Sequence, residues 1–334
     1  MDKVFVQTNE ADGNRVIVFQ RGDDGALTEL GSVATGGNGD GVPHLTSQGS
    51  VVLTQDGTRL VVANAGSGDI SVFAIADEAS LVQVVPTGAA PKSVAEHAGL
   101  LYVLNTGAPS LAGFRLTNDG VEPLEGSLRE LAPDADPAQV GFTPDGSALL
   151  VTERGTNSLV VFSVATDGLL GEPAESPSAG PTPYGFAFAA NGALVVTEAF
   201  GAQKGKAAAS SYRLTGTTAK PVSRSVGNGR SEICWAVVTK DGRYAFTTNF
   251  ADGAVSCWAI GNDDSLTLED AVAGAAVEGQ PGLRDEDLSR DGRFLYAIDA
   301  DVGRIFGWSV ENGRLSPIGS WDGIPATVAG LAAS

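Results

Sequence analysis

The sequence predicts an all-β fold, a seven-bladed β-propeller whose blades are four-stranded antiparallel sheets. Three observations lead to this prediction. Short hairpin signals recur along the whole chain at a nearly constant spacing, each signal lies between short apolar runs, and the two ends of the chain supply complementary parts of one further unit. A repeat of about 40–50 residues that holds four strands is typical of a propeller blade.

The hairpin signals consist of a polar residue, Asp or Asn, and Gly, with HAG at 97–99 as a shortened form. Their closing glycines stand 42 to 50 residues apart, at positions 57, 99, 146, 192, 242 and 292. Apolar runs such as SVVL before the signal and RLVVAN after it are suited to two half-buried strands joined by a tight type I′ or related turn. Each signal therefore marks the first and second strands of a blade.

A third apolar run follows each pair, as in ISVFAI at 70–75 and VSCWAI at 255–260, and a polar turn then leads into a weaker fourth strand. The N-terminal segment supplies only second, third and fourth strands, beginning with KVFVQTN. The C-terminal segment PATVAGLA at 325–332 resembles a first strand alone. We therefore expect seven blades in a single domain over 1–334, closed where the last strand joins the N-terminal blade.

Composition narrows the possible partners and location. The net charge of −19 argues against nucleic acid and anionic membranes, since both attract clustered Lys and Arg. No apolar run is long enough for a membrane span, and the start of the chain shows no signal-peptide pattern, so we expect a cytoplasmic, acidic protein. Cys234 and Cys257 lie in strand-like runs without a metal or redox spacing, which favours buried thiols.

The ends of second strands and the starts of first strands should share one rim of the ring. Four of the seven second strands end in Asn, a residue that caps turns by bonding to backbone two residues on. Glu153, Glu198 and Asp299 replace Asn at this position in the other three. We predict that these carboxylates face the mouth of the axial channel, although a solvated charge or an ion pair with Arg154 or Arg304 would also account for them.

First strands, aligned on their hairpin glycines, supply further residues for the same mouth. Side chains alternate along a strand, so either of two neighbouring sets can point inward. The candidates are Lys92, Gln139, Trp235 and Asp285, with their neighbours Tyr184 and Arg284. Three carboxylates in GLRDED at 282–287 are costly in an apolar strand unless they are solvated, paired or bound to a ligand.

The chain has only two histidines, which limits the chemistry available to it. His44 precedes the first strand of the second blade and falls on the predicted rim, where it could act as a general base near neutral pH. His97 lies in a hairpin on the other face, and we leave it out of the predicted site. No spacing of His and Cys indicates zinc.

Several segments resemble a known family. VFVQTNEADGNRVIVFQRGDDGALTELGSV looks like the opening blade of the bacterial lactonase family of seven-bladed propellers, and AQVGFTPDGSALLVTERGTNSLVVF and GPTPYGFAFAANGALVVTEAFG are similar to later blades. The family includes a 6-phosphogluconolactonase and is distantly similar to fungal carboxymuconate-lactonizing enzymes. Where the phosphogluconolactonase branch carries Gly-Pro-Arg-His, this chain reads GPTPYG at 180–185 and has Tyr184 in place of an imidazole.

The resemblance implies an enzyme acting on a small cyclic ester, a hydrolase first and an isomerase or cycloisomerase second. We assign Glu153 and Glu198 to acid–base chemistry or water positioning, with His44 or Asp285 as a second proton-transfer group. Lys92, Gln139 and Arg284 would supply donors for an oxyanion, while Tyr184 and Trp235 would form walls and Asp299 would contribute to substrate binding.

Two alternatives stay open. No cofactor is expected, but a variant of the site uses the rim carboxylates to hold calcium or magnesium, which prefer oxygen ligands. The chain could instead be a non-catalytic propeller that binds a ligand or a protein, because fold alone does not fix function. We expect a monomer or a weak homodimer with a small-molecule substrate as its partner.

Overall fold

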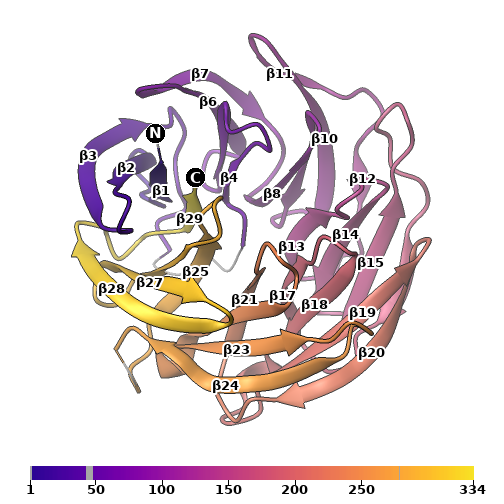
Figure 1. Cartoon of the computed structure of the whole chain (residues 1–334). Helices are drawn as coiled ribbons and strands as arrows, with labels where there is room; N and C mark the ends of the chain where they lie inside the picture. Colours follow the sequence, from indigo (N-terminus) through magenta and orange to yellow (C-terminus); the bar gives the residue numbers. More distant parts are fainter. Residues whose placement is uncertain (1, 43–47, 278) are drawn as a thin grey trace.

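The computed structural model describes residues 2–42, 48–277 and 279–334, and it places seven four-stranded antiparallel sheets around one axis (Figure 1). The fold class predicted from the hairpin spacing is confirmed. We number the blades from 1 to 7, beginning with the one that contains both chain ends. Apart from two short 3-10 helices, η1 (Phe200–Ala202) and η2 (Phe250–Asp252), the regular elements of these residues are strands.

Each blade is given from its innermost to its outermost strand. Blade 1 comprises β29 (Gly330–Ala333), β1 (Lys3–Gln7), β2 (Arg15–Arg21) and β3 (Leu27–Ala34). Blade 2 comprises β4 (Val51–Leu53), β5 (Arg59–Asn64), β6 (Asp69–Ile75) and β7 (Ala79–Pro86). Blade 3 comprises β8 (Pro91–His97), β9 (Leu100–Asn105), β10 (Ser110–Thr117) and β11 (Gly120–Pro123), and the short β12 (Arg129–Glu130) also pairs with β10.

The remaining blades repeat the same order. Blade 4 comprises β13 (Pro137–Phe142), β14 (Ala148–Glu153), β15 (Ser158–Ser163) and β16 (Ala174–Pro177). Blade 5 comprises β17 (Pro183–Phe188), β18 (Ala193–Glu198), β19 (Ala208–Thr215) and β20 (Thr218–Gly227). Blade 6 comprises β21 (Ile233–Val238), β22 (Tyr244–Asn249), β23 (Ala254–Ile260) and β24 (Leu266–Ala275), and blade 7 comprises β25 (Leu283–Leu288), β26 (Phe294–Asp299), β27 (Arg304–Glu311) and β28 (Arg314–Asp322).

The innermost strands surround the axis and contact one another in the ring order β29, β4, β8, β13, β17, β21, β25 and again β29. Apolar side chains of neighbouring blades fill the space between sheets, as Tyr102 and Leu149 do between blades 3 and 4. Second strands such as Leu100–Asn105 are buried along their whole length. The core therefore lies between the blades and leaves the axis to the edges of the inner strands.

The Asp-Gly hairpins have a common hydrogen-bond pattern. In the turn of blade 2, Asp56 Oδ1 accepts from Thr54 Oγ1 (2.7 Å) and from the Thr58 backbone N–H (2.9 Å), and Gly57 has φ +71°. Asp145 in blade 4 accepts in the same way from Thr143 and Ser147. The positive φ explains why Gly closes each hairpin. We call the end of the ring that carries these turns the hairpin face and the opposite end the loop face.

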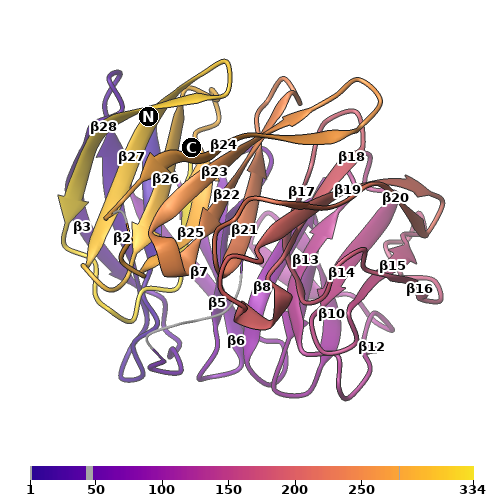
Figure 2. The same cartoon turned by 90° about the horizontal axis from the view of Figure 1, so that it is seen from below.

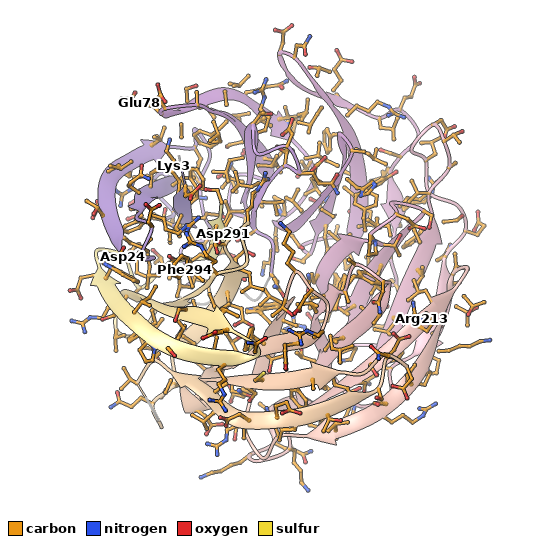
Figure 3. All side chains as sticks on the ribbon, viewed as in Figure 1. Lys3, Asp24, Glu78, Arg213, Asp291 and Phe294 are labelled. Carbon is orange, nitrogen blue, oxygen red and sulfur yellow. The ribbon has the colours of Figure 1, made fainter. Side chains whose placement is uncertain are left out.

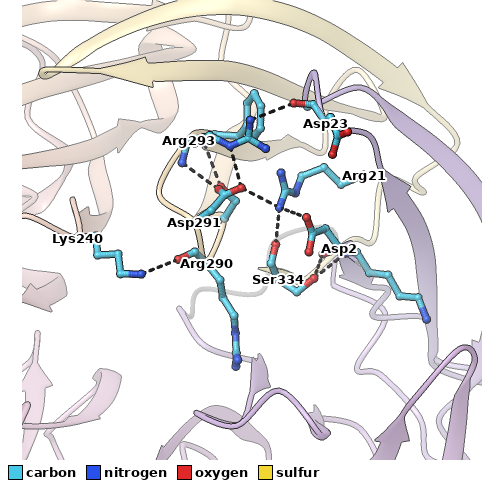
Figure 4. Close-up of polar contacts among 12 residues, drawn as sticks. Asp2, Arg21, Asp23, Lys240, Arg290, Asp291, Arg293 and Ser334 are labelled. Atoms are coloured by element: carbon cyan, nitrogen blue, oxygen red, sulfur yellow. Dashed lines mark hydrogen bonds and ion pairs between the residues drawn. The ribbon is translucent and has the colours of Figure 1, made fainter.

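The ring closes as predicted, because β29 pairs with β1 in register from Val4–Ala333 to Gln7–Gly330. Both chain ends lie at the same end of the molecule in the side view (Figure 2). The seam also carries a polar network on the hairpin face, in which Arg21 Nη2 bonds Asp2 (2.6 Å) and Asp291 (3.2 Å) (Figure 4). Lys3, Asp291 and Phe294 gather on this side of the ring, far from Arg213 (Figure 3).

The Arg21 side chain is only 1% exposed and lies over the Phe294 ring, 5.2 Å from its centroid. Burial alone would raise the pKa of Asp291, but hydrogen bonds from Ser289 and Arg293 and the charge of Arg21 lower it below its ordinary value. The carboxylate is thus held ionised between blade 7 and blade 1. This ion pair, buried on the Arg21 side and partly exposed on the Asp291 side, joins the two blades that the chain must bring together last.

Candidate functional site in the axial channel

A cavity of about 670 Å³ lies on the axis and opens at the hairpin face. Its walls are about equally polar and apolar and come from the inner strands of all seven blades, with Val94, Val140 and Phe186 among the apolar residues. Its polar lining includes Gln48, Gln139, Asp285, Glu286 and Asp287 in the interior and Gln55, Glu96, His97, Lys240 and Arg290 near the hairpins. Concave, largely apolar spaces with a few polar groups are the usual form of small-molecule sites.

The three consecutive carboxyl groups of β25 dominate the chemistry of this cavity. Asp285 Oδ2 accepts from the Leu331 backbone N–H (3.1 Å) in β29, and its Oδ1 accepts from the Glu286 N–H (3.0 Å). Asp285 is 1% exposed, and burial raises the pKa of its carboxyl well above the ordinary value. Asp285 lies in the wall of this cavity, and its predicted role in proton transfer stays a prediction.

Glu286 is also 1% exposed, and among the described residues neither of its carboxyl oxygens has a hydrogen-bond partner within normal distance. Burial raises its pKa well above the ordinary value, the neighbouring Asp285 and Asp287 raise it further, and the Thr248 backbone amide offsets this only in part. Other blades carry Val140, Phe186 or Ala236 at the equivalent position. The sequence predicts Glu286 only as part of the segment 282–287. Its burial and the lack of hydrogen bonds to its oxygens within the described residues are known from the structure.

Asp287 lies two residues after Asp285 in β25, on the same face of the strand, and is partly accessible from the cavity. Its Oδ2 accepts from the Ala333 N–H (2.8 Å) and its Oδ1 from the Leu288 N–H (2.9 Å). Burial raises the pKa of this carboxyl to about 7, against the opposing effect of the two amides and of Arg290. A carboxyl that exchanges its proton near neutral pH inside a cavity is a candidate for acid–base catalysis.

Gln139 and His97 are two further polar residues of the cavity wall, and both have hydrogen-bond partners. Gln139 bonds both the backbone N–H (2.7 Å) and C=O (3.1 Å) of Phe186, so its amide is engaged with the next blade. His97, which the sequence analysis set aside, lines the cavity near its mouth. Its Nδ1 lies 3.0 Å from Gln55 Nε2, and its ring packs against Phe142.

At the loop face, aromatic and cationic side chains pack around the entries of the inner strands. Tyr184 and Trp235 are 8% and 3% exposed, and their ring centroids are 4.8 Å apart. Arg154 lies over the Tyr184 ring at 4.8 Å and pairs with Asp136 (2.6 Å). Among the residues lining the cavity neither Tyr184 nor Trp235 is found. The structure therefore places these two predicted walls in a packed cluster at the other end of the channel.

Two further predicted binding residues also lie outside the cavity lining. Arg284 is 5% exposed, lies over the Phe250 ring at 4.5 Å and contacts Asp301 at 3.4 Å. Burial lowers the pKa of its guanidinium. Lys92 is half-buried at an irregularity in the pairing of β8 with β9.

The carboxylates at the ends of second strands are buried inside their blades, and they do not line the axial cavity. Glu198 accepts from Ser210 Oγ (2.5 Å), Ser225 Oγ (2.7 Å) and the Gly180 N–H (2.9 Å), which tie together the third and fourth strands of its own blade. Glu153 accepts from Thr156 Oγ1 (2.7 Å). Burial raises the pKa of both groups, and these hydrogen bonds partly offset the rise.

Asp299 has the turn-capping role that the sequence analysis gave to Asn. Its Oδ1 accepts from the backbone N–H groups of Asp301 (3.1 Å) and Val302 (3.2 Å), whereas Asn249 donates to Ala254 O and Ser256 Oγ in the third strand. The alternative ion pairs are also not formed, because Arg154 pairs with Asp136 and Arg304 with Asp322. His44 lies outside the described residues.

Within the described residues, no group of three or more His, Cys, Asp and Glu side chains has a metal-binding arrangement. The described part of the chain also contains no helix long and apolar enough to cross a membrane. Burial raises the pKa of both cysteine thiols to about 12, which fits the prediction of buried, unreactive groups.

Comparison with known proteins identifies the family. The model of the family described as "Lactonase, 7-bladed beta-propeller" matches residues 3–120, 119–199 and 196–325. The chain belongs to this lactonase family. The match spans nearly all the blades, so membership applies to the whole ring and not to one repeat. A comparison with curated proteins gives no match.

Solved structures share the fold of this lactonase-family propeller at low sequence identity. A "putative 6-phosphogluconolactonase" of Bacteroides uniformis is 17% identical with a TM-score of 0.76, over 100% of this chain and 99% of the other. A protein of Lactobacillus plantarum is 16% identical with a TM-score of 0.77 over 100% of both chains. The periplasmic gluconolactonase of Pseudomonas aeruginosa is 17% identical with a TM-score of 0.53, over 99% of this chain and 85% of the other. These similarities concern the fold.

Proposed function

We propose that this lactonase-family propeller hydrolyses a small cyclic ester inside the axial cavity, with Asp287 as the general base. The observation that carries the proposal is a carboxyl whose pKa is raised to about 7, held by two backbone amides on the wall of a cavity of about 670 Å³. Family membership and the gluconolactonases among the similar structures support the ester class.

In the proposed reaction, ionised Asp287 removes a proton from a water molecule as its oxygen attacks the lactone carbonyl. The ring C–O bond of the tetrahedral intermediate then breaks, and the proton returns from Asp287 to the leaving ring oxygen, giving an open hydroxy acid. Lys240, Arg290 and His97 near the cavity mouth offer donors for the negative charge on the carbonyl oxygen. The reverse sequence closes the ring, which keeps lactonizing chemistry within reach of the same groups.

Asp287 takes over the acid–base role that the sequence analysis gave to Glu153 and Glu198, because those two carboxylates are held in hydrogen bonds within their blades. Asp285 stays a candidate for the second proton-transfer group. Its backbone contact with Leu331 favours a positioning role, since that contact fixes β25 against β29.

The proposal can be tested with a panel of γ- and δ-lactones, followed by acid release with a pH indicator. We expect Asp287→Asn to lower kcat by about a hundredfold or more, while Glu153→Gln and Glu198→Gln keep most of the activity. Activity of the unchanged protein should rise with pH through about 7, because the base must be ionised.

Loss of activity in the Glu variants together with full activity of Asp287→Asn would move the reaction to the loop face. Binding of lactones without turnover would instead support the alternative of a non-catalytic ligand-binding propeller.

A further inference from the structure

Two glutamine side chains make the same pair of hydrogen bonds at different places in the ring. Gln139, in blade 4, bonds the backbone N–H and C=O of Phe186 in blade 5, at 2.7 and 3.1 Å. Gln48, in the segment before β4 of blade 2, bonds the N–H and C=O of Ala236 in blade 6, at 3.2 and 2.9 Å. The first pair joins neighbouring blades, and the second does not.

The inner edges of the innermost strands explain why such bonds form. Each of these strands pairs with a second strand on one side only, so N–H and C=O groups of its other edge face the axis. Buried backbone groups without a partner cost free energy, and a carboxamide can satisfy one donor and one acceptor together. Ser93 and Asp285 serve the same purpose with single bonds to Val140 N and Leu331 N.

Blade 5 cannot supply the corresponding bond to blade 6. Its residue at the Gln139 position is Gly185, and a Cβ there would lie 2.6 Å from Cys234 O and 2.8 Å from Trp235 Cα. The close approach of β17 to β21 thus excludes any side chain at this point. The two edge groups of Ala236 are satisfied instead by Gln48.

Gln48 reaches Ala236 across the axis. The inner strand β4 lies between β29 and β8 in the ring, whereas β21 lies between β17 and β25. At least two blades therefore separate Gln48 from Ala236 in either direction around the ring. The backbone of Gln48 is held in turn by Ser93 Oγ, which donates to Gln48 O at 2.7 Å.

We propose that Gln48 is a crossbar that spans the axial channel and closes the inner end of the cavity. The closed end limits the length of ligand that can enter from the hairpin face. Gln48 lies with Gln139 and Asp285 in the cavity lining, while the hairpin residues line the mouth. The two aromatic rings of Tyr184 and Trp235 lie outside this lining. The length limit rests on the proposed function, but the crossbar itself does not.

Hydrogen exchange tests the crossbar without any assay of activity. In Gln48→Ala and Gln48→Met we expect the amide of Ala236, 188 residues away, to exchange about tenfold faster or more, with Phe186 unchanged. The matched control Gln139→Ala should speed exchange at Phe186 and leave Ala236 unchanged. Unchanged exchange at Ala236 in both Gln48 variants would overturn the crossbar.

Ligand length is tested with γ-lactones that carry alkyl chains of increasing length. Met fills nearly the volume of Gln without its hydrogen bonds, so Gln48→Met should keep the length limit while Gln48→Ala relaxes it. We expect the KM for the longest lactones, divided by the KM for the lactone without an alkyl chain, to be about tenfold lower in Gln48→Ala than in the unchanged protein.

Equal ratios of KM in the unchanged protein and in Gln48→Ala would overturn the length limit. Absence of turnover with every lactone would refute the proposed function, and the exchange result would still decide the crossbar.

Discussion

Blades 6 and 7 repeat one pattern of hairpin residues and apolar runs, in KDGRYAFTTNFADGAVSCWAI at 240–260 and RDGRFLYAIDADVGRIFGWSV at 290–310. Their second strands, β22 and β26, are buried along almost their whole length, and their hairpins have the same bonds. Their innermost strands are entirely different, ICWAVV in β21 and LRDEDL in β25. The repeat thus fixes the sheet, while the strand at the axis varies.

The backbone groups at the inner edges of β21 and β25 find hydrogen-bond partners in different ways. Blade 6 has no carboxylate or carboxamide side chain in β21, and the edge groups of its Ala236 bond Gln48 from across the ring. Blade 7 uses Asp285 to bond its own Glu286 N–H and the N–H of Leu331, and Asp287 to bond that of Ala333. The carboxyls of blade 7 therefore hold the last strand in place as well as lining the cavity.

The largest expected difference between the two blades is in the pH dependence of stability. The pKa of Asp287 is raised from 3.8 to about 7 in the folded protein, so the folded state holds a proton that the unfolded chain releases. The stabilisation is complete below pH 4 and is lost as the pH rises to 7. A change on the order of 4 kcal/mol corresponds to this shift, as an upper limit.

Urea unfolding between pH 4 and 7 measures this effect. Asp287→Asn should reduce the decline in unfolding free energy, because the amide does not titrate, while Asp285 and Glu286, whose pKa values burial also raises, still contribute to it. A decline of the same size in the variant would mean that Asp287 does not have the raised pKa and would weaken its assignment as a base.

The second expected difference concerns the hairpin carboxylates Asp241 and Asp291, which accept equivalent bonds within their turns. Each pairs with the exposed Arg two residues on, Arg243 or Arg293, but Asp291 also pairs with the buried Arg21. We expect Asp291→Ala to cost about 3 kcal/mol, since it weakens the pairing of a buried charge. The matched Asp241→Ala should cost about 1 kcal/mol, less than half of the loss expected for Asp291→Ala. A loss of this size is usual for an exposed ion pair and a turn hydrogen bond.

Unfolding of both variants in urea at pH 7 gives the comparison. Equal losses would show that Arg21 contributes nothing beyond the turn itself.

The smallest expected effect is a gain in stability from Glu286→Leu. Neither carboxyl oxygen has a hydrogen bond of normal length to the part of the chain that the structure describes, and other blades hold apolar residues at this position. Removing an unsatisfied buried polar group should stabilise the protein by about 1–2 kcal/mol, measured as a higher urea midpoint at pH 7. A lower midpoint would indicate that Glu286 has a partner in solution and would make blade 7 less distinct from blade 6.

The fold could be predicted from sequence because its signals are local and repeated. Asp-Gly turns require a residue that tolerates positive φ, and Gly57 and Gly242 meet that requirement in the same way. The closure by the C-terminal segment followed from counting strands, since blade 1 lacked a first strand.

The site was predicted less well because it depends on direction and distance. Glu198 ends its strand where expected, but its side chain turns toward Ser210 and Ser225 and away from the axis. Alternation along β25 left open which carboxyls face the cavity, and Asp287 was not singled out. The bond of Gln48 to Ala236 joins residues 188 positions apart, and no local sequence pattern predicts it.

The pairing of β29 with β1 has a consequence for how the protein is made. During synthesis from the N-terminus, the edge of β1 that faces the axis has to wait for Gly330–Ala333 before it finds its partner. While that segment is still untranslated or inside the ribosome, the inner edge of β1 stays open to mispairing. Folding of the first blade is therefore the last event to be completed, although its other strands are the first to be translated.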